Sequence, residues 1–376
     1  MKALLAVPFL PFCLVCACGD NLAGHTNASP DAHANGSADA GPQPVRAIAA
    51  EPPANFGPPP GIMSVLDVDT LKMQQNIEGG VAGGDPFIKK IGDRLYVINR
   101  TENNVLALDA ASLQFIGQLG TGPGSNPQDA AVVGDKVYVP SLGTAGVVVG
   151  TIGSAEIKTI DLNAAVGSTD GKPDCVGVAA VGTDVYVTCE NLVSFAPVSV
   201  GKLVVIDSTN DTVKTHIDLP VQNPQNLIAE LPDHTLVVSA YDKQNGCTMQ
   251  ITPGATPTAT CLVGNVQLAS NANPALAGAE PTHIAVQGSK IWFASTTNYT
   301  DGGLRSYDTA TAMMGAMVAP STENIRDVAV CPNGKIVVAD TAGNGGLRVY
   351  QDGAELTTAA LPIGLPPGFG NNLVCY

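Results

Sequence analysis

Apolar and polar residues alternate along this chain in short runs that recur about every 40 to 55 residues. Each copy has a polar or proline step, an apolar strand, a Gly/Asp/Asn turn and a second strand rich in Val and Tyr. Three copies read PFIKKIGDRLYVIN (86–99), PQDAAVVGDKVYVP (127–140) and PDCVGVAAVGTDVYVTC (173–189). Alternation with a period of two predicts β-strands. Self-similarity at this spacing predicts a β-propeller or another repeat array.

Each repeat divides into four strands, which the first complete copy places at 87–91, 94–99, 105–109 and 114–119. Two incomplete copies stand at the ends of the repeat region. Segment 64–77 resembles a third and fourth strand, and segment 370–375 resembles an innermost strand without a successor. Together they predict one composite blade that closes the ring and removes exposed sheet edges. Its second strand is missing unless segment 44–50 supplies it.

The predicted fold class is therefore all-β, a seven-bladed β-propeller, with a six-bladed ring as the alternative. Composition agrees, because 41 Gly and 28 Pro among 376 residues disfavour long helices. One large all-β domain can use most of this length. The net charge is −15 and no Lys/Arg cluster occurs, so nucleic acid is not an expected partner.

The amino terminus predicts export. Residues 1–17 contain one Lys before an apolar run that is too short to span a bilayer comfortably, which is typical of a signal peptide. The sequence VCAC (15–18) resembles a bacterial lipobox, and this resemblance implies cleavage before Cys18 and a lipid on its thiol. Gly19 in place of Asp favours the outer membrane, with the protein facing the periplasm or the cell surface. The alternative is an ordinary secretory signal with incidental cysteines.

The domain organisation follows from these features. Residues 1–17 are a predicted lipoprotein signal peptide, residues 18–60 a Pro/Ala/Gly/Asp-rich tether that begins with the lipidated cysteine, and residues 61–376 the propeller. The tether has too few apolar residues to fold by itself. Contact with a membrane is expected through the lipid anchor only.

Six cysteines remain once the leader is removed and Cys18 carries the lipid, and an even number in an exported chain predicts disulfides. Cys175 and Cys189 lie symmetrically about a turn at Gly182, where facing strand positions suit a disulfide. Cys247 and Cys261 flank the turn at 253–255 in the same way. By elimination, Cys331 pairs with Cys375 and fastens the carboxyl terminus. None of these six cysteines lies in a CxxC motif that would support a metal site instead.

A family resemblance is carried by VYVT (185–188) and by LYVIN (95–99) followed by NVLALD (104–109). These segments are similar to the YVTN-type β-propeller repeat, and the similarity covers roughly residues 62–376. The resemblance implies the fold but no single activity. Members and relatives include surface-layer and adhesive proteins, lactonases and heavy subunits of periplasmic electron-transfer enzymes. Long inserts at 191–201 and 261–280 depart from the repeat.

Aligned repeats place polar residues at the third position of several innermost strands, where they are expected to converge on one channel mouth. These candidates for ligand or metal binding are Asp129, Asn226, His283, Asp327 and Asn372. Their oxygens and one imidazole allow a divalent cation such as calcium, and no other cofactor is indicated. His283 could instead act as a base. The alternative is that these groups satisfy buried backbone and channel waters.

Long loops on the same predicted face carry Phe195, Tyr241 and Tyr299, and binding residues concentrate on loops held by a rigid scaffold. We therefore expect a lipid-anchored binding or scaffold module of the cell envelope, with a protein or a glycan as partner. The alternative is a hydrolase or lactonase-like enzyme at the channel mouth, with or without a metal. No GxSxG, HExxH, phosphate loop or CxxCH motif favours the enzyme. The sequence does not specify an oligomeric state.

Overall fold

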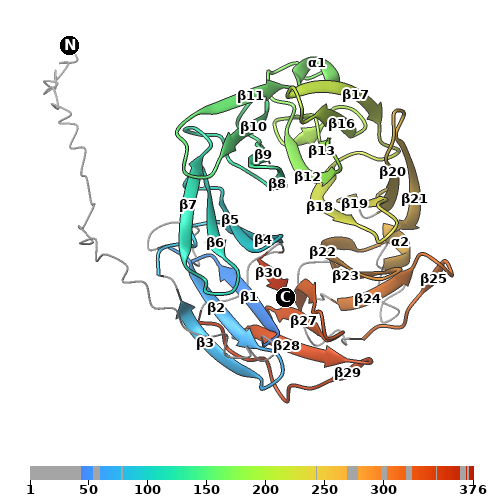
Figure 1. Ribbon diagram of the computed structural model, residues 1–376. Helices are drawn as coiled ribbons and strands as arrows, with labels where there is room; N and C mark the ends of the chain where they lie inside the picture. The colour runs from blue at the N-terminus through green and yellow to red at the C-terminus, as the bar shows by residue number, and fades with distance from the viewer. Residues whose placement is uncertain are drawn as a thin grey trace, which may run out of the picture. The chain divides into compact units, whose positions relative to one another are not determined.

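The computed structural model describes residues 44–53, 60–77, 79–242, 244–268, 278–297, 303–318, 324–343, 345–364, 370 and 372–376. They belong to one folded unit, Pro44–Tyr376, whose strands form seven four-stranded sheets and one small hairpin. Figure 1 shows the seven sheets as blades of a ring. The seven-bladed propeller is confirmed, and the six-bladed alternative is wrong. Residues 1–43, with the predicted signal peptide and Cys18, lie outside the described residues.

The blades are numbered from the first complete repeat. Blade 1 consists of β4 (Pro86–Ile91), β5 (Arg94–Asn99), β6 (Asn104–Asp109) and β7 (Phe115–Gly120). Blade 2 consists of β8 (Ala131–Val133), β9 (Lys136–Pro140), β10 (Gly146–Thr151) and β11 (Ile157–Asp161), followed by the short helix α1 (Asn163–Val166). Blade 3 consists of β12 (Cys175–Val181), β13 (Asp184–Cys189), β16 (Lys202–Asp207) and β17 (Thr212–Asp218). The hairpin of β14 (Leu192–Val193) and β15 (Ala196–Pro197) is inserted between its second and third strands.

The next three blades repeat this order. Blade 4 consists of β18 (Pro224–Glu230), β19 (Leu236–Ala240), β20 (Cys247–Thr252) and β21 (Thr258–Gly264), followed by α2 (Asn265–Leu268). Blade 5 consists of β22 (Glu280–Gln287), β23 (Lys290–Thr296), β24 (Gly303–Asp308) and β25 (Met313–Met314). Blade 6 consists of β26 (Ile325–Val330), β27 (Ile336–Asp340), β28 (Gly346–Gln351) and β29 (Ala354–Glu355).

Blade 7 is the composite blade and joins the two ends of the folded unit. From the centre outward it consists of β30 (Leu373–Cys375), β1 (Arg46–Glu51), β2 (Ile62–Asp67) and β3 (Lys72–Ile77). In this sheet Ala49 lies between Leu373 on one side and Ser64 on the other. The predicted closure is confirmed, and segment 44–50 does supply the second strand.

The folded unit consequently begins at Pro44 and not at residue 61, where the sequence placed the boundary. The physical reason is burial on both faces of β1. Ala47 packs with the apolar cluster shared with blade 6, and Ile48 packs with the cluster shared with blade 1. Both side chains are completely buried. Few residues of the segment are large and apolar, so its short run did not stand out from the tether.

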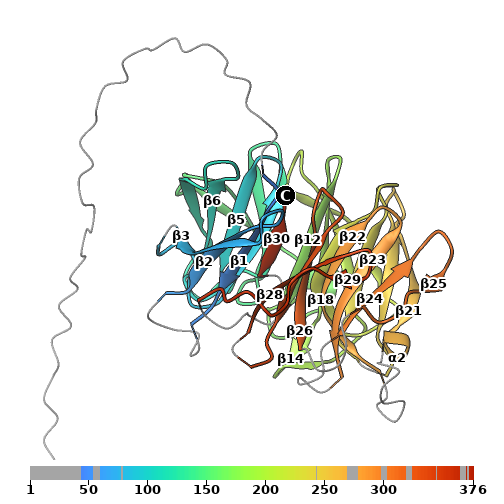
Figure 2. The same ribbon diagram turned by 90° about the horizontal axis from the view of Figure 1, so that it is seen from below.

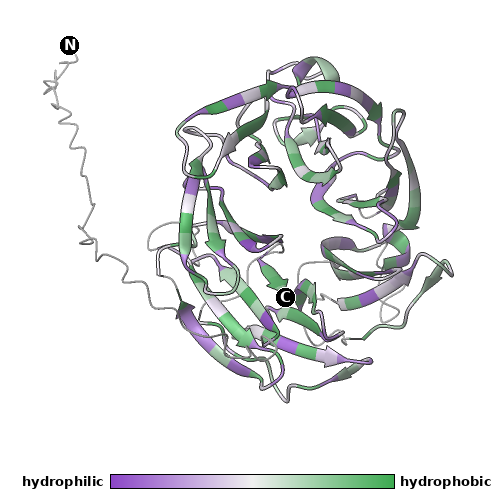
Figure 3. Ribbon diagram, viewed as in Figure 1, coloured by the Kyte–Doolittle hydropathy of each residue, from purple (hydrophilic) through white to green (hydrophobic). Residues whose placement is uncertain are grey.

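The core lies between the blades. Seven apolar clusters fill the seven interfaces of neighbouring blades, which is the packing that a closed seven-membered ring requires. Second strands such as β5 and β13 are buried on both faces, which explains their continuous apolar runs. The outermost strand β3 is largely exposed, and Figure 3 shows it as mainly hydrophilic.

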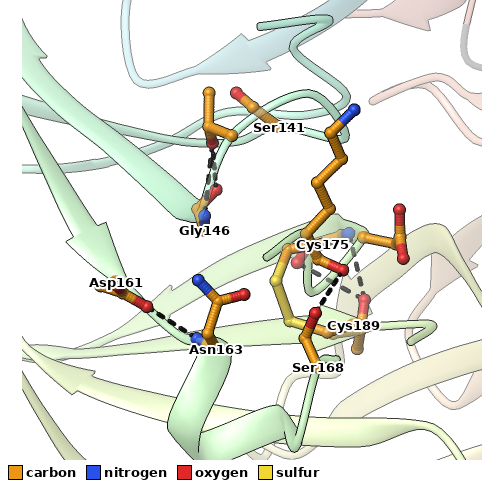
Figure 4. The surroundings of a disulfide bond; sticks show 12 residues. Ser141, Gly146, Asp161, Asn163, Ser168, Cys175 and Cys189 are labelled. Carbon is orange, nitrogen blue, oxygen red and sulfur yellow. Dashed lines mark hydrogen bonds between the residues drawn. A yellow bond between two sulfur atoms is a disulfide. The ribbon is translucent and has the colours of Figure 1, made fainter. Parts of the chain in front are cut away.

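Three disulfides join the pairs that the sequence predicted: Cys175–Cys189, Cys247–Cys261 and Cys331–Cys375. Cys175 and Cys189 face each other across β12 and β13, as Figure 4 shows. Cys261 instead faces Met249, because a bulge shifts the register, so its bond to Cys247 is diagonal. Three disulfides indicate an oxidising compartment, and the protein is therefore an exported one. Within the described residues, no helix has the length and hydrophobicity needed to cross a bilayer.

Candidate functional site

A cavity of about 550 Å³ opens at the face of the ring where the innermost strands begin. Its walls come from residues at the start of these strands and from loops that follow the second strands, as the repeat alignment predicted. The β14–β15 hairpin lies at the same face (Figure 2). Its lining includes Asp85, Phe87, Arg100, Gln128, Glu190, Phe195, Gln225, Asn226, Tyr241, Glu280, Arg326 and Asn372.

The predicted ring of polar residues does not line this cavity as one group. Asn226 and Asn372 reach the cavity. Asp129 and His283 lie deeper, in a second void of about 100 Å³ that Asn226 also lines. Asp327 is completely buried. The position immediately before the ring position supplies more of the cavity wall, including Phe87, Gln128, Gln225 and Arg326.

Asp129 links three consecutive blades. One carboxylate oxygen accepts the N–H of Ala130 at 2.7 Å, and the other accepts the N–H of Val178 in blade 3 at 2.9 Å. Lys89 of blade 1 donates to the same carboxylate at 2.9 Å. Burial raises the pKa of Asp129, while Lys89 and the Val178 N–H oppose this rise. Its oxygens are thus used to hold the blades together.

Asp327 repeats this arrangement in blades 5, 6 and 7. One oxygen accepts the N–H of Val328 at 2.7 Å and contacts Nδ1 of His283 in blade 5. The other oxygen accepts the N–H of Asn372 in blade 7 at 2.7 Å. Asn372 in turn donates from its side chain to the carbonyl oxygens of Ala50 and Pro86. At these positions the polar residues of the ring bind buried backbone groups, which is the structural alternative to ligand binding.

The arrangement does not favour the cation considered from the sequence. The carboxylates of Asp129 and Asp327 already accept backbone N–H groups and contact Lys89 or His283. Across the described residues, no group of three or more His, Cys, Asp or Glu side chains is placed to hold a metal ion. Calcium needs six to eight oxygen ligands, which these engaged carboxylates do not offer.

One side of the cavity carries an ion pair. Arg100 donates to Asp85 at 2.7 Å and to Gln128 at 3.3 Å. Its guanidinium also lies 4.0 Å from the centre of the Phe87 ring, a cation–π contact. The charge of Asp85 is therefore balanced within the protein.

Glu190 is different, because its carboxyl group is buried without a partner. It follows β13 directly and is 6% exposed. Within the part of the chain that the structure describes, no hydrogen bond or ion pair reaches this carboxyl group. Burial, and then the nearby charge of Asp174, raise the pKa of Glu190 to about 8. A carboxyl group without a counter-ion keeps its proton in such a site.

Gln225 adds a second unsatisfied acceptor. Its amide nitrogen donates to the carbonyl oxygen of Pro281 at 3.0 Å, which fixes the orientation of the amide group. The amide oxygen is buried and has no hydrogen-bond partner. Tyr241 lies close by, and the pKa of its hydroxyl is raised by burial and by the charge of Glu190. Its side chain as a whole is 43% exposed, so the ring extends from the cavity to the surface.

The rim of the cavity is apolar and exposed. Phe195 lies at the turn between β14 and β15 and is 94% exposed, although it also borders the cavity. Val193 and Val198 beside it are 39% and 54% exposed. Phe195 has a positive φ of 62°, an uncommon conformation for a bulky residue. The hairpin therefore presents an aromatic ring to solvent at the edge of a polar cavity.

The loop candidates from the sequence are placed as follows. Phe195 and Tyr241 both line the cavity, and Tyr299 lies outside the described residues. Sequence reasoning missed Glu190, whose only signal was its position at the start of a long insert. It also passed over Gln225, although the repeat alignment placed this residue next to the ring.

No protein-family model matches the sequence, and no curated protein matches it. Solved structures share the fold. The ring is similar to the periplasmic gluconolactonase PpgL of Pseudomonas aeruginosa, with a TM-score of 0.63, 13% identity and coverage of 88% of this chain and 98% of that one. The β-propeller domain of Cps50 (Swd1) of Myceliophteria thermophila is similar with a TM-score of 0.57 and 10% identity, over 81% of this chain and 95% of that one. Apo AztD of Citrobacter koseri is similar with a TM-score of 0.53 and 14% identity, over 89% of this chain and 98% of that one. At such identities the likeness shows the propeller fold alone.

Proposed function

We propose that this protein is an exported, lipid-anchored propeller that binds a partner protein through the face bearing the 550 Å³ cavity. The observation that carries the proposal is the exposed apolar rim around a polar cavity. Phe195 is 94% exposed, and Tyr241 and Val198 beside the mouth are 43% and 54% exposed. Aromatic residues around a polar pocket are typical of the centre of a protein interface. A glycan partner is the other outcome that the test can give.

Phe195→Asn is expected to abolish partner binding without loss of stability. Asn tolerates the positive φ at this position better than Phe does, so the hairpin should keep its shape. The measurement is affinity capture from the envelope of the native cells with the wild-type protein and the variant, followed by measurement of binding between the purified proteins.

Phe115→Asn is the matched control, because Phe115 is also exposed, at 52%, but lies on the outermost strand of blade 1. We expect a protein that the wild type and this control retain and that Phe195→Asn loses. Equal retention by all three proteins would refute the proposed face, and a captured glycan would replace the protein partner.

The proposal includes the lipid anchor at Cys18 and membership of the YVTN-type repeat family. Both rest on the sequence motifs, since VCAC (15–18) resembles a lipobox and VYVT (185–188) resembles the repeat. Cys18→Ala is expected to move the protein from the membrane fraction to the soluble fraction, because it removes the thiol that would carry the lipid. Unchanged partitioning after cell fractionation would contradict the anchor.

A lactonase-like hydrolase is the second candidate, and one observation favours it. Glu190 has a pKa of about 8 and borders the cavity near Tyr241, which suits a general acid or base at neutral pH. Hydrolysis of gluconolactone by the purified protein, lost in Glu190→Gln, would support this candidate. Hydrolysis at the same rate in both proteins would count against it.

A further inference from the structure

The cavity contains two hydrogen-bond acceptors to which none of the described residues donates. The Gln225 oxygen is buried and unpartnered, and its orientation is set by the bond from its nitrogen to Pro281. The Glu190 carboxyl group has no hydrogen bond or ion pair among the described residues, although its residue is only 6% exposed. Buried acceptors without donors are costly, so two of them at one cavity indicate that a ligand supplies the donors.

The other charged residues that line the cavity are Asp85, Arg100, Glu280 and Arg326, and each has partners of its own. Arg100 is engaged by Asp85 and Gln128 and lies over the Phe87 ring. Glu51 is the other buried carboxyl group without a partner in the described part of the chain, but it lines neither void. Glu190 and Gln225, by contrast, both line the cavity.

An ammonium group complements this pair. It presents three donors and no acceptor, whereas a hydroxyl or carboxylate ligand would bring acceptors of its own. The aromatic ring of Tyr241 beside the pair and that of Phe195 at the rim also suit a cation. The net charge of −15 favours the approach of a basic partner.

We infer that the partner protein inserts a lysine side chain into the cavity, where its ammonium group pairs with the Glu190 carboxylate and donates to the Gln225 amide oxygen. This inference rests on the proposed function, because it names the chemistry by which the same face recognises its partner. The apolar rim at Phe195 packs against the surface around that lysine.

Binding must remove the proton that Glu190 carries in the free protein. Asp174 of the same blade acts on the Glu190 carboxyl group, and the charge of Glu190 in turn acts on the hydroxyl of Tyr241 in blade 4. Arg100 of blade 1 and Glu280 of blade 5 act on that hydroxyl too and line the same cavity. With a pKa of about 8, Glu190 is mostly protonated at pH 7. An incoming ammonium group stabilises the carboxylate, and the proton leaves to the buffer. Lysine binding at pH 7 thus releases about one proton per complex.

The test uses the purified mature protein and two capped peptides that contain one lysine, either free or acetylated at the ε-nitrogen. Calorimetric titration in buffers of different ionisation enthalpy measures affinity and proton release together. We expect the free-lysine peptide to bind with release of about one proton. The acetylated peptide should bind at least about tenfold more weakly, because it lacks the charge.

Variants of the site give further readouts. Glu190→Gln should weaken binding of the free-lysine peptide about tenfold or more and abolish proton release. Asp174→Asn should strengthen binding at pH 7, because it removes the charge that disfavours the Glu190 carboxylate and keeps an oxygen for the N–H of Leu192. Phe115→Asn should change neither quantity. Thermal melting confirms that each variant is folded.

The outcomes separate the inference from the proposed function. Equal affinity for the two peptides, or binding unaffected by Glu190→Gln, would overturn the lysine inference. If the native partner is still lost with Phe195→Asn and retained with Glu190→Gln, the binding face stands and only the lysine inference fails. If the partner is retained with both variants, both proposals fail.

Discussion

Replacing Asp327 by Ala is expected to lower the free energy of unfolding by about 3 to 5 kcal/mol. The carboxylate is completely buried and joins blades 5, 6 and 7 through His283, its own strand and Asn372. Its removal leaves the N–H groups of Val328 and Asn372 without their acceptors in a dry environment. Chemical denaturation followed by tryptophan fluorescence measures the loss, since Trp292 lies in blade 5.

Asp135→Ala is the matched control, because Asp135 is exposed in the turn between β8 and β9. This variant should change the free energy of unfolding by less than about 0.5 kcal/mol. If the two substitutions cost the same, Asp327 does not hold the blades together and the interpretation of the ring as structural would be wrong.

Removing the Cys331–Cys375 disulfide by replacing both cysteines with Ala is expected to cost about 4 kcal/mol. The chain-entropy relation gives this value for a sequence separation of 44 residues. The bond joins Cys331, directly after the innermost strand β26 of blade 6, to β30, the short innermost strand of blade 7. Without it, the carboxyl terminus is held by the pairing with β1, by the hydrogen bonds of Asn372 and by packing against neighbouring blades. Hydrogen exchange should show β30 and β1 losing protection first.

The Cys247–Cys261 pair provides the control for this experiment, because it spans 14 residues within one hairpin of blade 4. Its double Ala variant should cost about 3 kcal/mol and leave exchange in β30 and β1 unchanged. Unaltered protection of these strands in the Cys331/Cys375 variant would show that the disulfide is not needed for ring closure.

Much of the fold follows from the repeat, because strands, turns and hairpin symmetry are local properties. The strands of the first repeat and the partners of all three disulfides could be predicted this way. The diagonal pairing of Cys247 and Cys261 could not, since the bulge in that hairpin depends on packing between blades. Segment 44–50 could be offered only as a possible second strand of the composite blade, because β1 is short and is stabilised by contacts with both neighbouring blades.

The site was less predictable, because aligned repeats give the depth of a residue in the ring but not its partners. Asp129 and Asp327 lie at equivalent strand starts as expected, yet their side chains reach the next blade and bind its backbone. Glu190 follows the repeat phrase directly and resembles a turn residue in sequence. Its burial depends on how the inserted hairpin and the loop at Tyr241 meet, which no local pattern records.

The channel mouth holds the buried carboxyl group of Glu190, to which no described residue forms a hydrogen bond or ion pair. Titration of the Glu190 side chain by ¹³C NMR tests this claim most directly. The midpoint should lie near pH 8 in the free protein, because burial and the Asp174 charge raise the pKa. It should fall when the free-lysine peptide is added. A midpoint near the ordinary glutamate value of about 4.3, unchanged by the peptide, would contradict the account.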